Sequence, residues 1–319
     1  MSLKQIKTLS KDPYMIRKTL MAAALGLNLT ISVTLDANSA QHNIETAEGI
    51  AKVMRKIQCS LKDGEAVTYW WYGRAFGRRL GMSDKYLFDV EGMNIRHCDT
   101  VRDEEDNYGY VLRTREILLY KDKNTGKVLR SWENPYTGEE VEVWHVDNDP
   151  VNSGPSFGMG RDRSVQAFPG SMLGDRWWFT STIPLYYENV LGGDYQKYIG
   201  GTYRATEMFN FFGDVESLMD ENVDSANVQI GWVRHSDWLP WMKMAGRDGI
   251  IYMHTAGRKL ESWDDMSETI KDEIAKNYPK YTSPPPLDDN RENETSWTFF
   301  KKKMEERGGP EPIKREFPF

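Results

Sequence analysis

The sequence predicts a mainly β (α+β) protein: an antiparallel, lipocalin-like β-barrel or a strongly bent sheet, with helices at its periphery. Segments rich in β-branched and aromatic residues recur along the chain between clusters of Gly, Asp and Asn, which is typical of consecutive antiparallel strands. The 11 Trp and 16 Tyr residues suit both a large β core and the lining of a ligand pocket. Asp122-Lys-Asn124-Thr-Gly126 indicates a hairpin turn, because Asn and Gly tolerate the positive φ of tight turns.

A helix is expected at 44–61, ahead of the strands. Ile50, Val53 and Ile57 recur there at helical spacing, and turn residues at 62–64 end the pattern. Four antiparallel strands should follow in consecutive order. Their predicted ranges are 67–76, 86–97, 108–120 and 127–132.

A second turn, at 134–138, leads into a strand in which Val141, Val143 and His145 point to one side of the sheet. The Gly- and Pro-rich segment 152–175 lacks periodicity, and irregular segments of this length usually cover a site. The remaining predicted elements are strands at 176–187, 227–235 and 250–259, a strand running into a helix at 203–219, a helix at 264–277, and an extended tail from Tyr281 that wraps the surface.

Composition and missing motifs argue against several function classes. With 41 basic and 48 acidic residues the net charge is −7 and no basic stripe is present, so nucleic acid is not an expected partner. Neither GxGxxG after a strand nor GxxxxGK[ST] occurs, which argues against nucleotide cofactors. HExxH and CxxC are absent as well, so we expect no cofactor and no metal.

Residues 1–43 have the order of a secretory leader. A basic stretch at 4–18 is followed by an apolar stretch at 19–35 and by small residues at 37–40. The apolar stretch is too short and too polar for a stable membrane span. We therefore expect an exported or periplasmic protein, the alternative being a cytoplasmic protein that retains an N-terminal helix.

Two cysteines, Cys59 and Cys98, are too few for a disulfide framework or a CxxC-type zinc site. We interpret them as buried free thiols. A bridge between them is the alternative, and it requires that the protein leave the cytoplasm.

A candidate site follows the second turn. His145, Asp147 and Asp149 are spaced two residues apart, so on a continuous strand they share a face and place an imidazole between two carboxylates. This pattern is typical of a general base oriented by an acid, or of a His-plus-carboxylate metal site. The alternative is that Asp149-Pro150 only forms a turn, so the catalytic prediction narrows to His145 and Asp147. The neighbouring Trp144 is assigned to substrate binding.

A second candidate site lies in WVRHSDWLPWMK, at 232–243. Arg234 ends a predicted strand, and Trp238 and Trp241 line one side of the helical turn after it. An aromatic wall beside the cations Arg234 and Lys243 is suited to acidic or phenolic ligands. Core packing explains the Trp pair equally well, but it does not explain the two cations.

Residues of three other strands are expected to line the same pocket. Tyr252 and His254 share a strand face, with His254 as a catalytic residue, although ordinary half-buried strand residues give the same pattern. Arg74 and Glu91 lie in neighbouring strands; such charges usually face solvent or pair across the sheet, but inside a barrel they mark a ligand cavity. Trp71 belongs to a run of three aromatic residues, at least one of which must point inward.

Five blocks of the sequence occur in the order of a known family. They are FDVEGMN at 88–94, ENPYTGE at 133–139, HVDNDPV at 145–151, WLPWMKM at 238–244 and NETSW at 293–297. Together they resemble the bacterial family catalogued as domain of unknown function 1838, over roughly 44–302. The resemblance implies one integrated domain at 44–319 and supports an export signal, but it implies little about mechanism.

Two function classes compete for a cavity of this kind. The first is a cofactor-independent enzyme of aromatic compound catabolism, acting on an aromatic or polycyclic small molecule; we prefer a lyase that uses general acid and base over a hydrolase, because the sequence offers no convincing set of metal ligands. In this hypothesis His145, oriented by Asp147, removes a proton, and Arg234 stabilises the developing oxyanion. The alternatives are a non-catalytic carrier of an apolar aromatic ligand and a metal-dependent hydrolase. The expected partner is a small apolar or aromatic molecule. The sequence does not decide whether the protein forms a homodimer.

Overall fold

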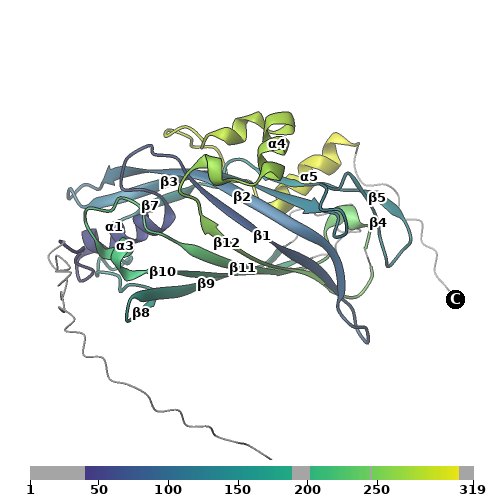
Figure 1. Ribbon diagram of the computed structural model, residues 1–319, viewed down its shortest axis with the longest axis horizontal. Helices are drawn as coiled ribbons and strands as arrows, with labels where there is room; N and C mark the ends of the chain where they lie inside the picture. The colour runs from purple at the N-terminus through teal and green to yellow at the C-terminus, as the bar shows by residue number, and fades with distance from the viewer. Residues whose placement is uncertain (1–39, 189–201, 245, 309–319) are drawn as a thin grey trace, which may run out of the picture. The chain divides into compact units, whose positions relative to one another are not determined.

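One large antiparallel sheet organises the protein. The structure is a computed structural model, which describes residues 40–188, 202–244 and 246–308. The strands of the sheet are β1 (Val67–Arg78), β2 (Lys85–Arg102), β3 (Tyr108–Lys121), β6 (Val146–Asn148), β7 (Ser153–Ser156), β8 (Ser171–Leu173), β9 (Arg176–Glu188), β10 (Thr202–Asp214), β11 (Gln229–Ser236) and β12 (Ile250–Lys259). Within the described residues their order is β6-β3-β2-β1-β12-β11-β10-β9-β8, and β7 also pairs with β3 (Figure 1).

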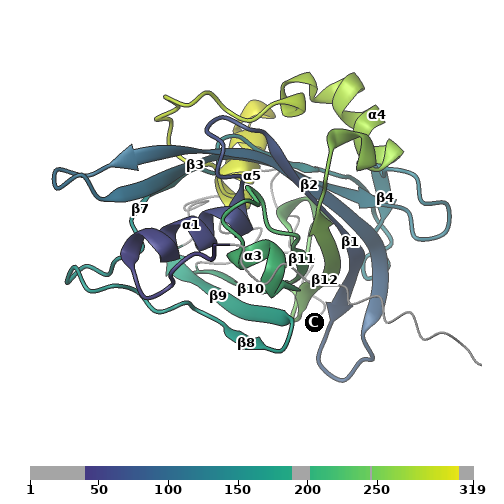
Figure 2. The same cartoon turned by 60° about the vertical axis from the view of Figure 1, so that its left-hand side comes forward.

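The prediction of a mainly antiparallel β protein is confirmed. Strands that follow one another along the chain pair as hairpins, and β12 returns to pair with β1, which places Trp71 opposite Gly257 and Ala75 opposite Met253. Figure 2 shows the resulting sheet as a curved surface. In the part of the chain that the structure describes, the outer strands β6 and β8 do not pair with each other. The strongly bent sheet therefore describes the fold, and closure into a lipocalin-like barrel is not confirmed.

Helices occupy both sides of the curved sheet. Helices α1 (Ala47–Gln58), α3 (Val215–Met219) and α5 (Ser296–Glu306) lie on the concave side, where Ile57 of α1 and Phe300 of α5 join one buried cluster with Trp71 and Trp232 (Figure 2). Helix α4 (Glu268–Asn277) lies on the convex side and buries its apolar face, including Ile270, against β2 and β3. Both faces of β2 and β3 are therefore packed, and these strands carry few exposed residues.

Short 3-10 helices connect several elements. They are η2 (Pro240–Met242), η3 (Trp263–Asp265) and η4 (Pro279–Thr282). The extended tail predicted from Tyr281 is only partly correct, because the chain forms α5 from Ser296 onward. Thr295 caps this helix, and Trp297, Phe300 and Met304 recur at helical spacing and are buried. That apolar period was present in the sequence and indicates the helix.

The predicted strand through His145 is divided into two. β4 (Ser131–Glu133) pairs with β5 (Glu140–Glu142) in a separate two-stranded sheet, residues 143–145 belong to no strand, and β6 joins the main sheet at β3. A continuous strand would keep one alternation from 141 to 149, so this division removes the basis for placing His145 and Asp147 on one face.

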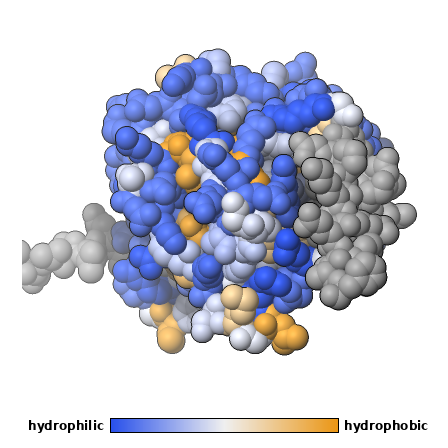
Figure 3. Space-filling model, turned by 90° about the vertical axis from the view of Figure 1, so that its right-hand side faces the viewer, coloured by the Kyte–Doolittle hydropathy of each residue, from blue (hydrophilic) through white to orange (hydrophobic). Residues whose placement is uncertain are grey.

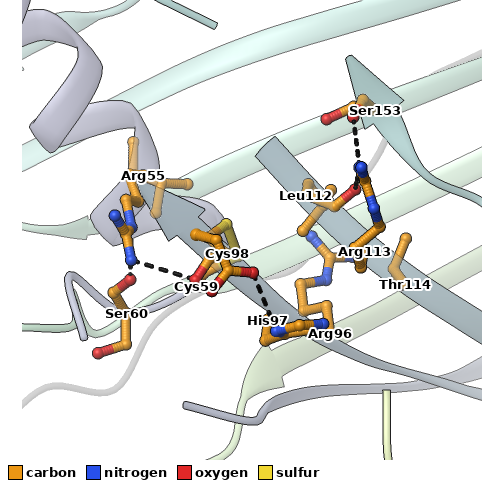
Figure 4. Close-up of a disulfide and its surroundings, with 12 residues drawn as sticks. Arg55, Cys59, Ser60, Arg96, His97, Cys98, Leu112, Arg113, Thr114 and Ser153 are labelled. Atoms are coloured by element: carbon orange, nitrogen blue, oxygen red, sulfur yellow. Dashed lines mark hydrogen bonds and ion pairs between the residues drawn. A yellow bond between two sulfur atoms is a disulfide. The ribbon is translucent and has the colours of Figure 1, made fainter. Parts of the chain in front are cut away.

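Helix α1 is tied to the sheet at its C-terminal end. Cys59 follows the helix and forms a disulfide with Cys98 of β2, across a Cα–Cα distance of 5.9 Å (Figure 4). The interpretation of these cysteines as free thiols is therefore wrong. Beside the bridge, the buried Arg55 donates hydrogen bonds to the carbonyl of Ser60 at 2.8 Å and to Asp63 Oδ1 at 2.7 Å. The covalent link and these polar bonds fix α1 against β2.

The predicted leader lies almost entirely outside the described residues, which begin at 40. Among the described residues, none of the helices has the length and apolarity needed to cross a bilayer. The face drawn in Figure 3 is mostly hydrophilic, with apolar side chains scattered over it in small groups.

Candidate functional site

The concave side of the sheet contains a cavity of about 180 Å3. Its walls come from β1, β2, β3, β6, β10 and β11, and Ser296 at the start of α5 lies at its border. Apart from Ile117, the lining residues of these strands are the ones that alternate onto the concave face, which the curvature of the sheet brings together. One part of the wall is aromatic and the other is polar.

The aromatic part is formed by Trp71 of β1, Trp232 of β11 and two Phe residues of β10, at 209 and 211. The Trp71 and Trp232 rings meet edge to face, with centroids 6.4 Å apart. Gly92 of β2 makes room for the Trp71 indole: a Cβ atom there would lie 2.4 Å from the ring. Gly92 is thus required by the close approach of the ring and not by its backbone angles.

The polar part contains two guanidinium groups in different surroundings. Arg234 of β11 lies directly opposite Glu207 of β10 and donates to its Oε1 at 2.8 Å; it also donates to Ser296 Oγ at 3.2 Å. Arg96 of β2 donates through Nε to Asn94 Oδ1 at 2.9 Å, and its guanidinium lies 4.9 Å from the centroid of the Tyr69 ring. Burial lowers the pKa of Arg96, which nevertheless stays a cation at any physiological pH.

Glu116 of β3 adds a carboxyl group to the polar part. Its Oε1 accepts a hydrogen bond from Asn148 Nδ2 at 2.8 Å. Burial raises the pKa of Glu116, and the carboxylate of Glu207 acts in the same direction, whereas the Asn148 amide and the two cavity arginines lower it. Burial is the largest of these effects, so this carboxyl group holds its proton to higher pH than an exposed glutamate does.

Of the residues predicted for the site, the structure brings two to the cavity, Trp71 and Arg234. The block HVDNDPV at 145–151 also contributes, but through the other face of the strand: Val146 lines the cavity and Asn148 holds Glu116. The segment 145–151 therefore does form a wall of the cavity, but through Val146 and Asn148 and not through the side chains predicted for the site.

His145 is held entirely by backbone groups. Its Nδ1 accepts from the Tyr120 N–H at 3.1 Å, and its Nε2 donates to the Leu129 carbonyl at 2.8 Å, so both ring nitrogens are in use. Burial lowers the pKa of His145 to about 4, and the imidazole is neutral at pH 7. This arrangement joins β3 to the 128–130 segment and leaves no ring nitrogen for a substrate, which argues against a role as general base.

Asp147 and Asp149 do not flank the imidazole. Asp147 lies opposite Ile117, a residue of the convex core cluster. Asp149 is buried and pairs with Arg115 at 3.2 Å, Lys280 at 2.7 Å and Arg291 at 3.0 Å. Asp149 thereby binds the C-terminal segment to the sheet through ion pairs, a structural role different from that of a turn residue.

Asp147 supplies a stability prediction. Burial raises the pKa of its carboxyl to about 6, with Lys303 opposing the shift and Glu294 adding to it. Between pH 4 and 6 the folded state holds a proton that the unfolded state releases, so the charged carboxylate destabilises the fold above pH 6. We expect Asp147→Asn to raise the free energy of unfolding by about 2 kcal/mol at pH 7.5 and by nothing at pH 4, measured by urea unfolding.

The matched control is Asp288→Asn, which makes the same substitution at an exposed aspartate and should change stability little at either pH. Equal effects of Asp147→Asn at pH 4 and pH 7.5 would show that charge at this position does not matter.

The remaining predicted aromatic residues pack away from the cavity. Trp241 is buried against Phe88 and Tyr120, and Trp238 donates from Nε1 to the Asp248 carbonyl at 3.1 Å. Trp144 is half-buried under the Arg307 guanidinium. For the Trp238–Trp241 pair the core-packing alternative describes what is observed. Lys243, the cation predicted beside them, is exposed.

Four other predicted residues lie on the convex side of the sheet. Glu91 is buried there and pairs with Lys121 at 2.6 Å. Arg74 and His254 are exposed and face each other across β1 and β12, and Tyr252 donates to Asp84 Oδ2 at 2.8 Å. The prediction that these charged strand residues line the cavity is therefore wrong. In β1 the residues that point to the concave side are Tyr69, Trp71 and Ala75.

The residues that sequence reasoning missed are Arg96, Glu116 and Glu207. One signal for Glu116 was present, since it alternates in phase with Leu118 and Tyr120 and therefore had to share their buried face. Among the described residues, no group of three or more His, Cys, Asp and Glu side chains is arranged to hold a metal ion. The metal-dependent hydrolase therefore gains no support from this part of the chain.

Comparisons with known proteins give a family. No curated protein and no solved structure matches the chain. The family model described as protein of unknown function (DUF1838) matches residues 64–304, which include every strand from β1 to β12 and therefore the whole wall of the cavity. The match confirms the resemblance carried by the five sequence blocks, and the chain belongs to the DUF1838 family.

Proposed function

We propose that the protein binds a small aromatic molecule in this cavity and acts on it as a cofactor-independent enzyme of the lyase class. The observation that carries the proposal is the Glu116 carboxyl group, which lines an aromatic cavity together with two guanidinium groups. A carboxyl group whose pKa is raised by burial is suited to exchange a proton with a bound molecule, as general acid–base catalysis requires.

The size of the cavity limits the ligand. An engineered protein cavity of about 150 Å3 holds one benzene molecule. At about 180 Å3 the cavity has room for one aromatic ring with a small substituent, and a polycyclic compound exceeds it. We propose that the concave sheet encloses the ligand in the way that lipocalin-type barrels do.

In the proposed reaction Glu116 transfers the proton and replaces His145 in that role. Asn148 orients the carboxyl group through its hydrogen bond to Oε1. Arg234 is positioned by Glu207 and Ser296 and would stabilise negative charge that develops on the ligand. None of these steps needs a bound cofactor.

The test begins with the molecule that the protein binds. Small molecules extracted from protein purified from its native source are identified by mass spectrometry, and turnover of the identified compound is then followed by NMR. We expect Glu116→Gln to lower the turnover rate by about 100-fold, because one general acid–base group contributes roughly that much, and to change the dissociation constant little. Glu133→Gln, an exposed carboxylate of β4, is the matched control and should leave both unchanged.

Two results would contradict the enzyme proposal in different ways. Unchanged turnover in Glu116→Gln would remove Glu116 from the mechanism. A molecule that binds in the cavity but is returned unaltered by the wild-type protein would favour the second candidate, a non-catalytic carrier, for which the aromatic lining alone is sufficient.

We also propose that the protein is exported to an oxidising compartment. The Cys59–Cys98 disulfide supports this location, because disulfides persist in the periplasm and outside the cell and are rare in the cytosol. The leader-like order of residues 1–43 agrees with it. N-terminal sequencing of the native protein tests the proposal: a first residue near position 40 supports export, and a retained Met1 in a cytosolic fraction contradicts it.

A further inference from the structure

Arg96 brings a positive charge to the cavity, where it attracts Glu116 electrostatically but forms no ion pair with any described residue. Among the described residues, no Asp or Glu oxygen lies within 4.0 Å of its guanidinium, whereas Arg234 pairs with Glu207 at 2.8 Å. The contacts of Arg96 use its Nε–H, which donates to Asn94, and one face of the group, which lies over Tyr69. The N–H groups on its two terminal nitrogens have no hydrogen-bond partner in the described part of the chain.

This arrangement is suited to a carboxylate ligand. The terminal nitrogens of a guanidinium present two parallel N–H groups that match the two oxygens of a carboxylate. Arg96 is half-buried, and its terminal N–H groups are available to a ligand that enters the cavity. Arg234 is already paired with Glu207, so the terminal N–H groups of Arg96 are the ones placed to bind the carboxylate of a ligand.

The strand register orders the cavity from an aromatic end to a cationic end. The concave positions along β2 are Gly92, Asn94 and Arg96, each about 7 Å from the next. Gly92 lies opposite Trp71 of β1, and Asn94 lies opposite Glu116 of β3. A ligand with its ring beside Trp71 and its anionic group at Arg96 therefore passes Glu116, the group proposed to transfer the proton.

We propose that the ligand of this cavity is the anion of a single-ring aromatic carboxylic acid, with its ring against Trp71 and Trp232 and its carboxylate on the terminal N–H groups of Arg96. The inference rests on the proposed function and narrows its ligand to one chemical class. The cavity volume limits the ligand to a single ring, and the Trp pair indicates that this ring is aromatic. Arg96 indicates that the ligand is an anion.

Calorimetric titration of the full-length protein with sodium benzoate and with benzamide tests this assignment. The two probes have nearly the same shape and differ in charge, so their affinity ratio reports the carboxylate. We expect benzoate to bind about 30-fold more tightly than benzamide, the ratio that a charge-assisted hydrogen bond typically supplies. Phenyl phosphate, a larger dianion, should bind more weakly than benzoate.

The outcomes separate this inference from the function on which it rests. If benzamide binds as tightly as benzoate, or phenyl phosphate more tightly, the carboxylate assignment is wrong and the cavity still binds aromatic molecules. If none of the three binds, the proposed aromatic ligand class fails, and the carboxylate assignment fails with it.

Variants of Arg96 provide the second readout. Arg96→Met should remove the difference between benzoate and benzamide, and Arg96→Lys, which keeps the charge without the paired N–H groups, should retain a reduced difference. Arg258→Met, at an exposed position of β12, is the matched control and should bind benzoate as the wild type does. Without ligand, Arg96→Met should unfold at a temperature equal to or above that of the wild type, because it removes a half-buried guanidinium that forms no ion pair. A large fall in that temperature would show that Arg96 stabilises the fold, which would overturn the proposal.

Discussion

Removal of the Cys59–Cys98 disulfide should lower the free energy of unfolding by about 4 kcal/mol. The two cysteines are 39 residues apart in the chain, and closing a loop of that length restricts the unfolded state by roughly this amount. The double variant Cys59→Ala, Cys98→Ala therefore loses a large part of the stability of an ordinary domain, which is about 5–15 kcal/mol. Urea unfolding followed by tryptophan fluorescence measures the difference.

Dithiothreitol supplies an internal control for this experiment. Both cysteines are fully buried, so the reductant acts when the chain unfolds and should lower the unfolding midpoint of the wild type alone. The double variant should unfold at the same urea concentration with and without reductant. A wild-type midpoint that does not respond to dithiothreitol would contradict the disulfide.

His145→Ala should lower the free energy of unfolding by about 3 kcal/mol at pH 7. The change leaves the Tyr120 N–H and the Leu129 carbonyl without their hydrogen bonds in a buried region, at a cost of roughly 1–3 kcal/mol for each group. The matched control is His254→Ala, because His254 is exposed on the convex side and its loss should change stability by less than about 0.5 kcal/mol. Equal effects of the two substitutions would contradict the structural role of His145.

The pH dependence of stability gives an independent test of His145. Burial lowers the pKa of His145 from 6.5 to about 4, so between these values the unfolded state binds a proton that the folded state does not. The contribution of this group is fully present above pH 6.5 and is lost as the pH falls toward 4, by up to about 3 kcal/mol. His145→Gln should abolish this part of the acid sensitivity, whereas a catalytic role alone would leave the stability profile unchanged.

The strands were predictable because the sequence pattern that indicates each strand lies within that strand and its flanking turns. β1, β3, β9 and β12 follow the predicted ranges closely, since alternation, β-branched residues and flanking turns are local properties of the chain. Whether the sheet closes depends instead on pairing between distant strands, and no local pattern records it. The helix α5 was missed for a different reason: its apolar period follows three prolines, which suggested an extended tail.

The candidate site was predictable only where a residue type and its strand face agreed. Trp71 and Arg234 satisfy both conditions. His145 was chosen for its chemistry, but the chain leaves β-structure at 143–145, and the imidazole there serves backbone groups of two segments. Arg96 and Glu116 resembled ordinary strand charges, and only the three-dimensional pairing of β1, β2 and β3 shows that they share one cavity.

The pairing of β1 with β12 also bears on how the protein folds. Tyr69 pairs with Lys259, roughly 190 residues later in the chain, so this contact carries a large loop-closure entropy and forms slowly. The three N-terminal strands β1, β2 and β3 can assemble from neighbouring hairpins as soon as they emerge, but Arg234 and Glu207 reach the cavity only after β12 has docked. The ligand cavity is therefore among the last parts of the molecule to form, and a chain that is interrupted before β12 would expose the aromatic side of its first strands.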